Sequence, residues 1–161
     1  MTQSHEPDSS QVLIFNTSSG KLELVGRVIY SEKEWQKRLT PLQFLVARLK
    51  GTEPAFSGAY HSSHERGLYH CICCGSDLFS SETKFASETG WPSFRAPVHV
   101  NNVRLADDLT LGMKRTEVLC TRCDAHLGHV FDDGAPPTGM RYCINSASLS
   151  FTRGEVLQGS V

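Results

Sequence analysis

The chain has 161 residues, which is enough for one domain with a sizeable hydrophobic core. Its formal net charge is −1 and no run of like charges occurs, so the composition argues against nucleic-acid binding and against an anionic membrane surface as a partner. No apolar stretch approaches the length of a membrane span, and the polar start lacks the parts of a signal peptide. We therefore expect a cytoplasmic protein that binds neither nucleic acid nor membrane.

The polar, serine-rich start of the chain, residues 1–20, is interpreted as a flexible or loosely docked arm. Residues 21–161 are expected to form a single domain. From about residue 68 onwards, short β-rich pieces alternate with Gly, Pro, Asp and Asn. This pattern predicts a mainly β fold, in which a small antiparallel β domain follows an N-terminal helical segment.

Two helices are predicted between the arm and the β-rich part. Residues 31–39 begin with capping-box spacing, and residues 40–51 have a threonine cap, a proline in the first turn and a glycine stop. In the second helix, Leu42, Leu45 and Leu49 lie on one side, which indicates an apolar face.

Four of the six cysteines form two CxxC motifs, Cys71 with Cys74 and Cys120 with Cys123. Two such turns can direct four thiolates to one point, which is the ligand set of a tetrahedral structural zinc. We predict one Zn²⁺ per chain, which would join two distant hairpins. The alternatives are redox CxxC motifs, unligated core thiols, or iron in the same cage. Cys73, inside the first motif, is interpreted as a bystander.

The remaining cysteine, Cys143, lies in the segment GMRYCINSAS. If this segment is a strand, Arg141, Cys143 and Asn145 point to the same side. A neighbouring cation lowers the pKa of a thiol and so favours the reactive thiolate. Since free cysteines are also among the most buried residues, the segment alone leaves open whether Cys143 is a nucleophile or a core thiol.

Two further stretches, TGWPSF and HLGHVFDDG, concentrate residue types with special chemistry. His126 and His129 can each hold or accept a proton near neutral pH, although each can also be structural or, less plausibly, a metal ligand. Trp91 alone suits a core position with its N–H bonded to a carbonyl. Asp133 is a candidate to fix the tautomer of one of the histidines.

Four blocks, CICCGSDLFSSETKF, GWPSF, CTRCDAHLGHVFDDG and GMRYCINSASLSF, resemble the B class of peptide methionine sulfoxide reductases, which act on the R epimer at sulfur. The resemblance runs from about residue 31 to residue 151. It implies two antiparallel β-sheets in a tent- or barrel-like arrangement, with N-terminal helices and a zinc clip. It also implies catalytic residues Cys143, His129, His126, Asn145 and Arg141, substrate-binding Trp91, and zinc ligands Cys71, Cys74, Cys120 and Cys123.

The resemblance further implies a reaction. Cys143 as a thiolate would attack the sulfur of methionine-R-sulfoxide, free or in oxidised proteins, and protonated His129 or His126 would donate to the oxygen, leaving methionine and a cysteine sulfenic acid. We favour His129 as the acid. Many members have a resolving cysteine where this chain has Thr89. We therefore expect thioredoxin or another external thiol to regenerate Cys143 without an internal disulfide.

Two other classes of function compete with this interpretation. A zinc-stabilised β fold can serve as a binding module without catalysis, in which case Cys143 is a core thiol and the histidines have no reason to accompany it. A nucleic-acid-binding zinc ribbon is disfavoured by the balanced charge.

Overall fold

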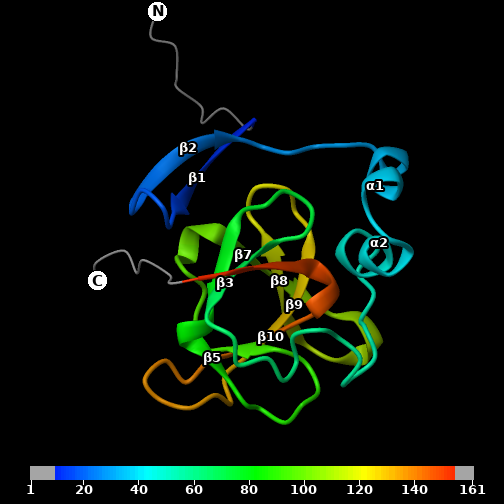
Figure 1. Ribbon diagram of the computed structural model, residues 1–161. Helices are drawn as coiled ribbons and strands as arrows, with labels where there is room; N and C mark the ends of the chain where they lie inside the picture. The colour runs from blue at the N-terminus through cyan, green and yellow to red at the C-terminus, as the bar shows by residue number, and fades with distance from the viewer. Residues whose placement is uncertain (1–9, 155–161) are drawn as a thin grey trace, which may run out of the picture.

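The computed structural model describes residues 10–154 and shows a mainly β protein with two short helices (Figure 1). All strand pairs are antiparallel. In the described part of the chain, no helix is long and apolar enough to cross a membrane. The elements are β1 (Gln11–Asn16), β2 (Lys21–Gly26), α1 (Glu32–Arg38), α2 (Pro41–Ala47), β3 (Gly67–Cys71), β4 (Asp77–Ser80), β5 (Lys84–Phe85), β6 (Ser93–Phe94), β7 (Val103–Asp108), β8 (Arg115–Cys120), β9 (His126–Phe131), β10 (Arg141–Ile144) and β11 (Leu149–Arg153).

The β body consists of a six-stranded sheet in the order β5-β6-β10-β9-β8-β7 and a three-stranded sheet in the order β11-β3-β4. These two sheets confirm the predicted fold class. Aromatic rings fill the space between them: Phe79 from β4 stacks on Phe94 from β6 with ring centroids 4.5 Å apart, and Tyr69 from β3 meets Phe94 edge-on. Such pairs add to the free energy gained by burying the rings, so this layer fixes β6 and its neighbour β10.

The structure describes part of the segment that was expected to be a flexible or loosely docked arm. Residues 11–26 form the β1–β2 hairpin, which lies over one end of the β body (Figure 1). The fully buried carboxamide of Asn102 accepts from the Phe15 N–H at 2.7 Å and donates to the Phe15 carbonyl at 2.9 Å. Asp77 accepts from both the N–H and the hydroxyl of Thr17. The expected boundary at residue 20 therefore falls within the hairpin, while residues 1–9 lie outside the described residues.

Both predicted helices are present and are capped as expected. Ser31 accepts from the N–H of Glu34, and Thr40 and Gln43 form a reciprocal capping box. The buried side of α2, however, presents Phe44 and its neighbours Val46 and Ala47, whereas the three leucines expected on its apolar face are 46–49 % exposed. The helix is short, and its contacts with the β body decide which side is covered.

Candidate active site and metal centre

The four cysteines of the two CxxC motifs converge, as the sequence predicted. Their sulfur atoms all lie within 4.8 Å of one another, and two Sγ–Sγ distances, Cys71 to Cys123 and Cys74 to Cys120, are 3.5 Å. A tetrahedral zinc with bonds of about 2.3 Å separates its sulfurs by about 3.8 Å, so the donor set fits such an ion. The four cysteines can therefore hold one metal ion. Cys73 is not a member of the group.

The two cysteine turns belong to different sheets. Cys71 ends β3 in the three-stranded sheet, and Cys120 ends β8 in the six-stranded sheet. Each turn closes with the same hydrogen bond, from the N–H of Gly75 to the Cys71 carbonyl and from the N–H of Asp124 to the Cys120 carbonyl. An ion bound here would join the two sheets and fix the start of β9, three residues beyond Cys123.

Cys143 lies on the outer face of the six-stranded sheet. Along β10, Tyr142 and Ile144 point into the core, so the alternation of side chains turns Arg141 and Cys143 to the opposite face. The register of the sheet places Cys143 directly opposite Ser93 of β6 and His129 of β9. Directly paired residues share a face and have neighbouring side chains. The sheet thus brings the thiol and an imidazole together.

Two opposing effects act on the Cys143 thiol. Burial raises its pKa above the ordinary value, because the charged thiolate loses water contacts. Arg141 and the Thr89 hydroxyl lower the pKa through charge and hydrogen bonding. The sequence predicted the effect of Arg141 but not that of burial, which is the larger.

Arg141 is held by Asp133. The guanidinium donates from Nε and Nη2 to the two carboxylate oxygens at 2.9 and 3.1 Å, and it lies 4.4 Å from the centre of the Phe131 ring. This fork raises the pKa of Arg141 and lowers that of Asp133. Asp133 therefore orients the cation beside Cys143; it is not bonded to a histidine as the sequence suggested.

A bulge in β9 brings both histidines to one face of the sheet, the face that carries Cys143. His126 and His129 are three residues apart, so a regular strand would place them on opposite faces. Between Val118 and Leu119 of β8 the register skips Leu127 of β9, so that Leu119 pairs with His126 while Glu117 pairs with His129. The extra residue restores the alternation, and the two rings lie 5.5 Å apart.

Each histidine is bonded to its own carboxylate. His126 donates from Nδ1 to Glu117 at 2.6 Å, and Glu117 also accepts from Lys50 at 3.3 Å. His129 donates from Nε2 to Asp108 at 2.7 Å, and Arg115 lies 3.4 Å from the same carboxylate. Sequence reasoning missed both carboxylates. Glu117 could have been noticed in the sequence, because it is an acidic residue beside the apolar end of β8. Asp108 could not, because its contact with His129 depends on how the strands pair.

The two pairs differ in their surroundings. Burial lowers the pKa of His126, and its bond to Glu117 only partly opposes this. The His126 Nε2 atom is buried and has no hydrogen-bond partner among the described residues. At the other pair, the hydrogen bond from His129 lowers the pKa of Asp108. His126 is thus biased toward the neutral form, whereas His129 contacts an ionised carboxylate.

Asn145 and Trp91 are joined through Glu53 instead of facing the thiol freely. The Asn145 carboxamide accepts from the N–H of Glu53 at 3.1 Å and donates to the Leu127 carbonyl at 3.1 Å, so both of its ends are used. Trp91 donates from its indole N–H to the Glu53 carbonyl at 3.0 Å. Asn145 therefore fixes the loop that holds Trp91.

The outer face of the sheet therefore combines a thiol, an oriented cation and two histidine–carboxylate pairs. This combination suits nucleophilic chemistry at sulfur with proton transfer from a neighbouring imidazole.

Comparison with known proteins agrees with this reading. Residues 39–153 match the SelR domain. The peptide methionine sulfoxide reductase MsrB of Acinetobacter baylyi is 50 % identical over 131 residues, which are 81 % of this chain and 94 % of that protein; the protein of the same name from Acinetobacter baumannii gives the same figures. The mitochondrial methionine-R-sulfoxide reductase B3 of Mus musculus is 54 % identical over 126 residues, 78 % of this chain and 50 % of that protein. The chain belongs to the MsrB family.

Proposed function

We propose that this protein reduces the R epimer of methionine sulfoxide, free or in proteins, to methionine. The observation that carries the proposal is the register that sets Cys143 opposite His129, with Arg141 on the same face. Family membership supports the same activity and speaks against a binding module without catalysis.

In the first half of the reaction, the Cys143 sulfur attacks the sulfoxide sulfur and the oxygen is protonated. The S–O bond of the sulfoxide breaks, so the methionine sulfur gains two electrons and leaves as a thioether, and the oxygen passes to Cys143 as a sulfenic acid. The Cys143 thiolate, the sulfoxide and one proton from the acid together account for both products. Arg141 stabilises the thiolate as it forms.

We assign the proton donor to His129 and a hydrogen-bonding role to His126. Because Nε2 of His129 is bonded to Asp108, the proton that reaches the oxygen comes from Nδ1. In neutral His126, Nδ1 carries the hydrogen and Nε2 is an acceptor that can orient water or substrate. Trp91 would provide the apolar wall for the S-methyl group.

In the second half, an external thiol clears the sulfenic acid. Two thiol equivalents give water, a disulfide of the reductant and free Cys143. Thr89 has a hydroxyl and no exchangeable sulfur, and Cys73 lies within a metal-binding turn, so we assign this step to thioredoxin or another external thiol reductant; a disulfide between Cys73 and Cys143 would contradict this assignment. A thiol-reducing compartment such as the cytoplasm suits this cycle.

The four clustered cysteines are proposed to hold one structural Zn²⁺. When bound, the ion would supply a cross-link between the sheets. Cys71 and Cys74 would contribute from the three-stranded sheet, and Cys120 and Cys123 from the six-stranded sheet.

The proposed activity is tested with the separate R and S epimers of N-acetyl-methionine sulfoxide, by following NADPH oxidation coupled through thioredoxin and its reductase. The R epimer should be consumed and the S epimer left. Cys143→Ser should abolish turnover while preserving the fold. Turnover by a folded Cys143→Ser protein, or consumption of both epimers, would contradict the proposal.

A further inference from the structure

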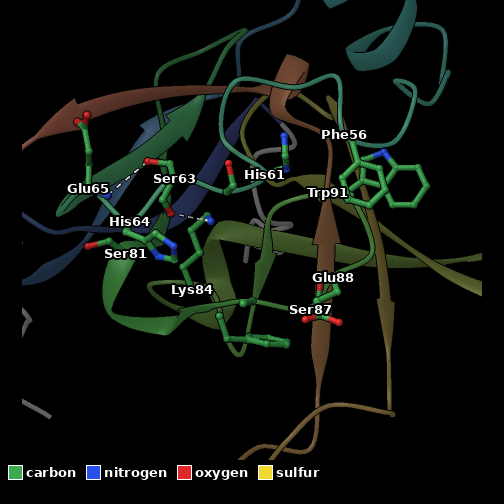
Figure 2. Close-up of a pocket in the computed structure, with 14 residues that line it drawn as sticks. Phe56, His61, Ser63, His64, Glu65, Ser81, Lys84, Ser87, Glu88 and Trp91 are labelled. Carbon is green, nitrogen blue, oxygen red and sulfur yellow. Dashed lines mark hydrogen bonds between the residues drawn. The ribbon is translucent and has the colours of Figure 1, made fainter.

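A pocket of about 340 Å³ adjoins Trp91, and no motif in the sequence predicted it (Figure 2). It lies between the loop of residues 56–65 and the segment of residues 81–91. Figure 2 shows two contrasting ends. Phe56 and Trp91 form an aromatic end, and a polar end gathers Ser63, His64, Ser81 and Lys84. We call this cavity the Lys84 pocket.

The Lys84 pocket is connected to the catalytic face by hydroxyl groups. Ser87 lines the pocket, and its Oγ lies 2.9 Å from the Thr89 hydroxyl and 2.7 Å from the Ser93 hydroxyl. Thr89 interacts with the Cys143 sulfur, and Ser93 pairs with Cys143 across the sheet. Phe85, which lines the pocket, pairs with Ser93, and Ser93 pairs with Cys143, so two strand spacings of about 4.8 Å separate this edge of the pocket from the thiol. A residue about three positions from the oxidised methionine, at up to about 3.5 Å of chain per residue, can span that distance.

The rim of the pocket adopts an unfavourable backbone conformation. Phe56 and Glu88 are in the left-handed region, with φ of 65° and 61°, which side chains of this size rarely adopt. A Cβ on Gly90 would lie 2.8 Å from the Ala55 Cβ, and the Phe56 N–H donates to the Gly90 carbonyl at 2.8 Å. Conformations of this kind persist where surrounding contacts enforce them, and they cluster at ligand sites.

The polar end carries a cation without an internal counter-ion. Lys84 is half-buried and donates to the Ser63 carbonyl at 2.9 Å, and none of the ion pairs among residues 10–154 includes it. Of the two acids that line the pocket, Glu65 pairs with Arg153 at 3.8 Å and points away in Figure 2, and Glu88 is exposed near the other end. Burial lowers the pKa of Lys84, and a carboxylate beside it would offset that loss of hydration.

We propose that the Lys84 pocket binds an acidic side chain close in sequence to the oxidised methionine of a polypeptide substrate. This inference rests on the proposed function and extends it: protein-bound methionine sulfoxide with a neighbouring Asp or Glu is the preferred substrate class. Ser63, His64 and Ser81 supply hydrogen-bonding groups beside the ammonium.

The test compares blocked peptides that contain methionine-R-sulfoxide and carry Glu, Gln or Lys, scanned through the positions on both sides. At the favoured position, kcat/KM for the Glu peptide should exceed that for the Gln peptide by about fivefold, as for a partly exposed charge-assisted contact, and the excess should shrink in high salt. Lys84→Met should erase the difference and leave N-acetyl-methionine-R-sulfoxide turnover unchanged. Lys84→Glu should favour the Lys peptide.

Lys37→Met provides the matched control, because it removes the same charge from an exposed position on α1. It should keep the preference for Glu. Equal kcat/KM for all peptides with the unmodified protein would overturn the Lys84 pocket, and so would a Glu preference that survives in folded Lys84→Met. The peptide series is measured with the unmodified protein, so it tests the proposal even if the Lys84 variants do not fold. If the unmodified protein turned over neither the peptides nor N-acetyl-methionine-R-sulfoxide, that result would contradict the proposed function instead.

Discussion

The reactivity of Cys143 depends on groups that lie on both sides of the thiol. Asp133 holds Arg141 in a fork, and the guanidinium offsets part of the rise in thiol pKa that burial causes. Ser87, which is itself bonded to Ser93, holds the Thr89 hydroxyl in the same region. The cation and the hydroxyl therefore act on the thiol from fixed positions, and each can be removed separately.

We predict that Arg141→Met raises the pKa of the Cys143 thiol further. At neutral pH, kcat/KM should fall about tenfold, the order expected for one charge interaction at a partly buried group, and should recover as the pH is raised. Iodoacetamide alkylation of Cys143 across a pH series measures the shift directly. Arg66→Met, on the exposed surface, is the control. An unchanged alkylation profile in Arg141→Met would rule out the assigned role.

Asp108→Asn should impair proton donation by His129. The substitution removes the negative charge that Nε2 of His129 contacts at 2.7 Å, so kcat/KM should fall about 10- to 100-fold at neutral pH. Glu117→Gln removes the corresponding charge beside His126, which we assign only a hydrogen-bonding role, and should have the smaller effect. A kcat/KM of Asp108→Asn equal to that of the unmodified enzyme would contradict the assignment of His129 as the acid.

The same Asp108 pair affects stability against acid. The folded-state pKa of Asp108 is depressed, so its contribution to the free energy of unfolding is present above the ordinary Asp range and is lost as the pH falls through the depressed value. In urea titrations, the stability difference between the unmodified protein and Asp108→Asn should be largest near neutral pH and disappear in strong acid. A difference that grows on acidification would contradict the linkage.

At the scale of elements, β9 and its bulge create the site. Gly128, at the centre of the strand, lies so close to β10 that a Cβ would clash with the Cys143 carbonyl oxygen. Only a residue without a side chain permits this approach between the strand that bears the histidines and the strand that bears the thiol.

Gly128→Ala should therefore separate β9 from β10. We expect a loss of roughly 2–4 kcal/mol of unfolding free energy, as for overpacking against backbone, together with loss of activity. Urea denaturation measures the first and the sulfoxide assay the second. Gly26→Ala, which meets nothing within 4 Å, is the control and should be close to neutral. A stable, active Gly128→Ala protein would show that the strands do not need this contact.

Local signals in the sequence predicted some elements and not others. Ser31 and Thr40 identified both helix starts because a cap depends only on residues nearby in the chain. The hairpin of residues 11–26 escaped detection because its attachment depends on Asn102 and Asp77, which are distant in sequence. The pairing of Cys143 with His129 likewise depends on strand register, which the spacing of residues does not reveal.

For the whole molecule, the four-cysteine centre brings together one turn from each of the two sheets. We predict one metal ion per chain, lost with folding in Cys120→Ser and retained in Cys73→Ser. Structural zinc contributes roughly 10–16 kcal/mol in small peptides, comparable with the stability of an entire domain, so loss of a ligand should unfold the chain. Elemental analysis and thermal melting test this. A well-folded Cys120→Ser protein with stoichiometric zinc would contradict it.

Asn102 attaches the β1–β2 hairpin by imitating a strand. The carboxamide gives Phe15 the same pair of hydrogen bonds that a peptide group of an adjoining strand would give, so one side chain takes the place of one peptide group. Of the hairpin's apolar side chains, Ile14 is buried, but Leu13 and Leu24 are 44 % and 62 % exposed. The hairpin lies ahead of the SelR domain match at residue 39, and its removal would expose the buried Asn102 carboxamide to water while leaving the aromatic layer between the two sheets intact.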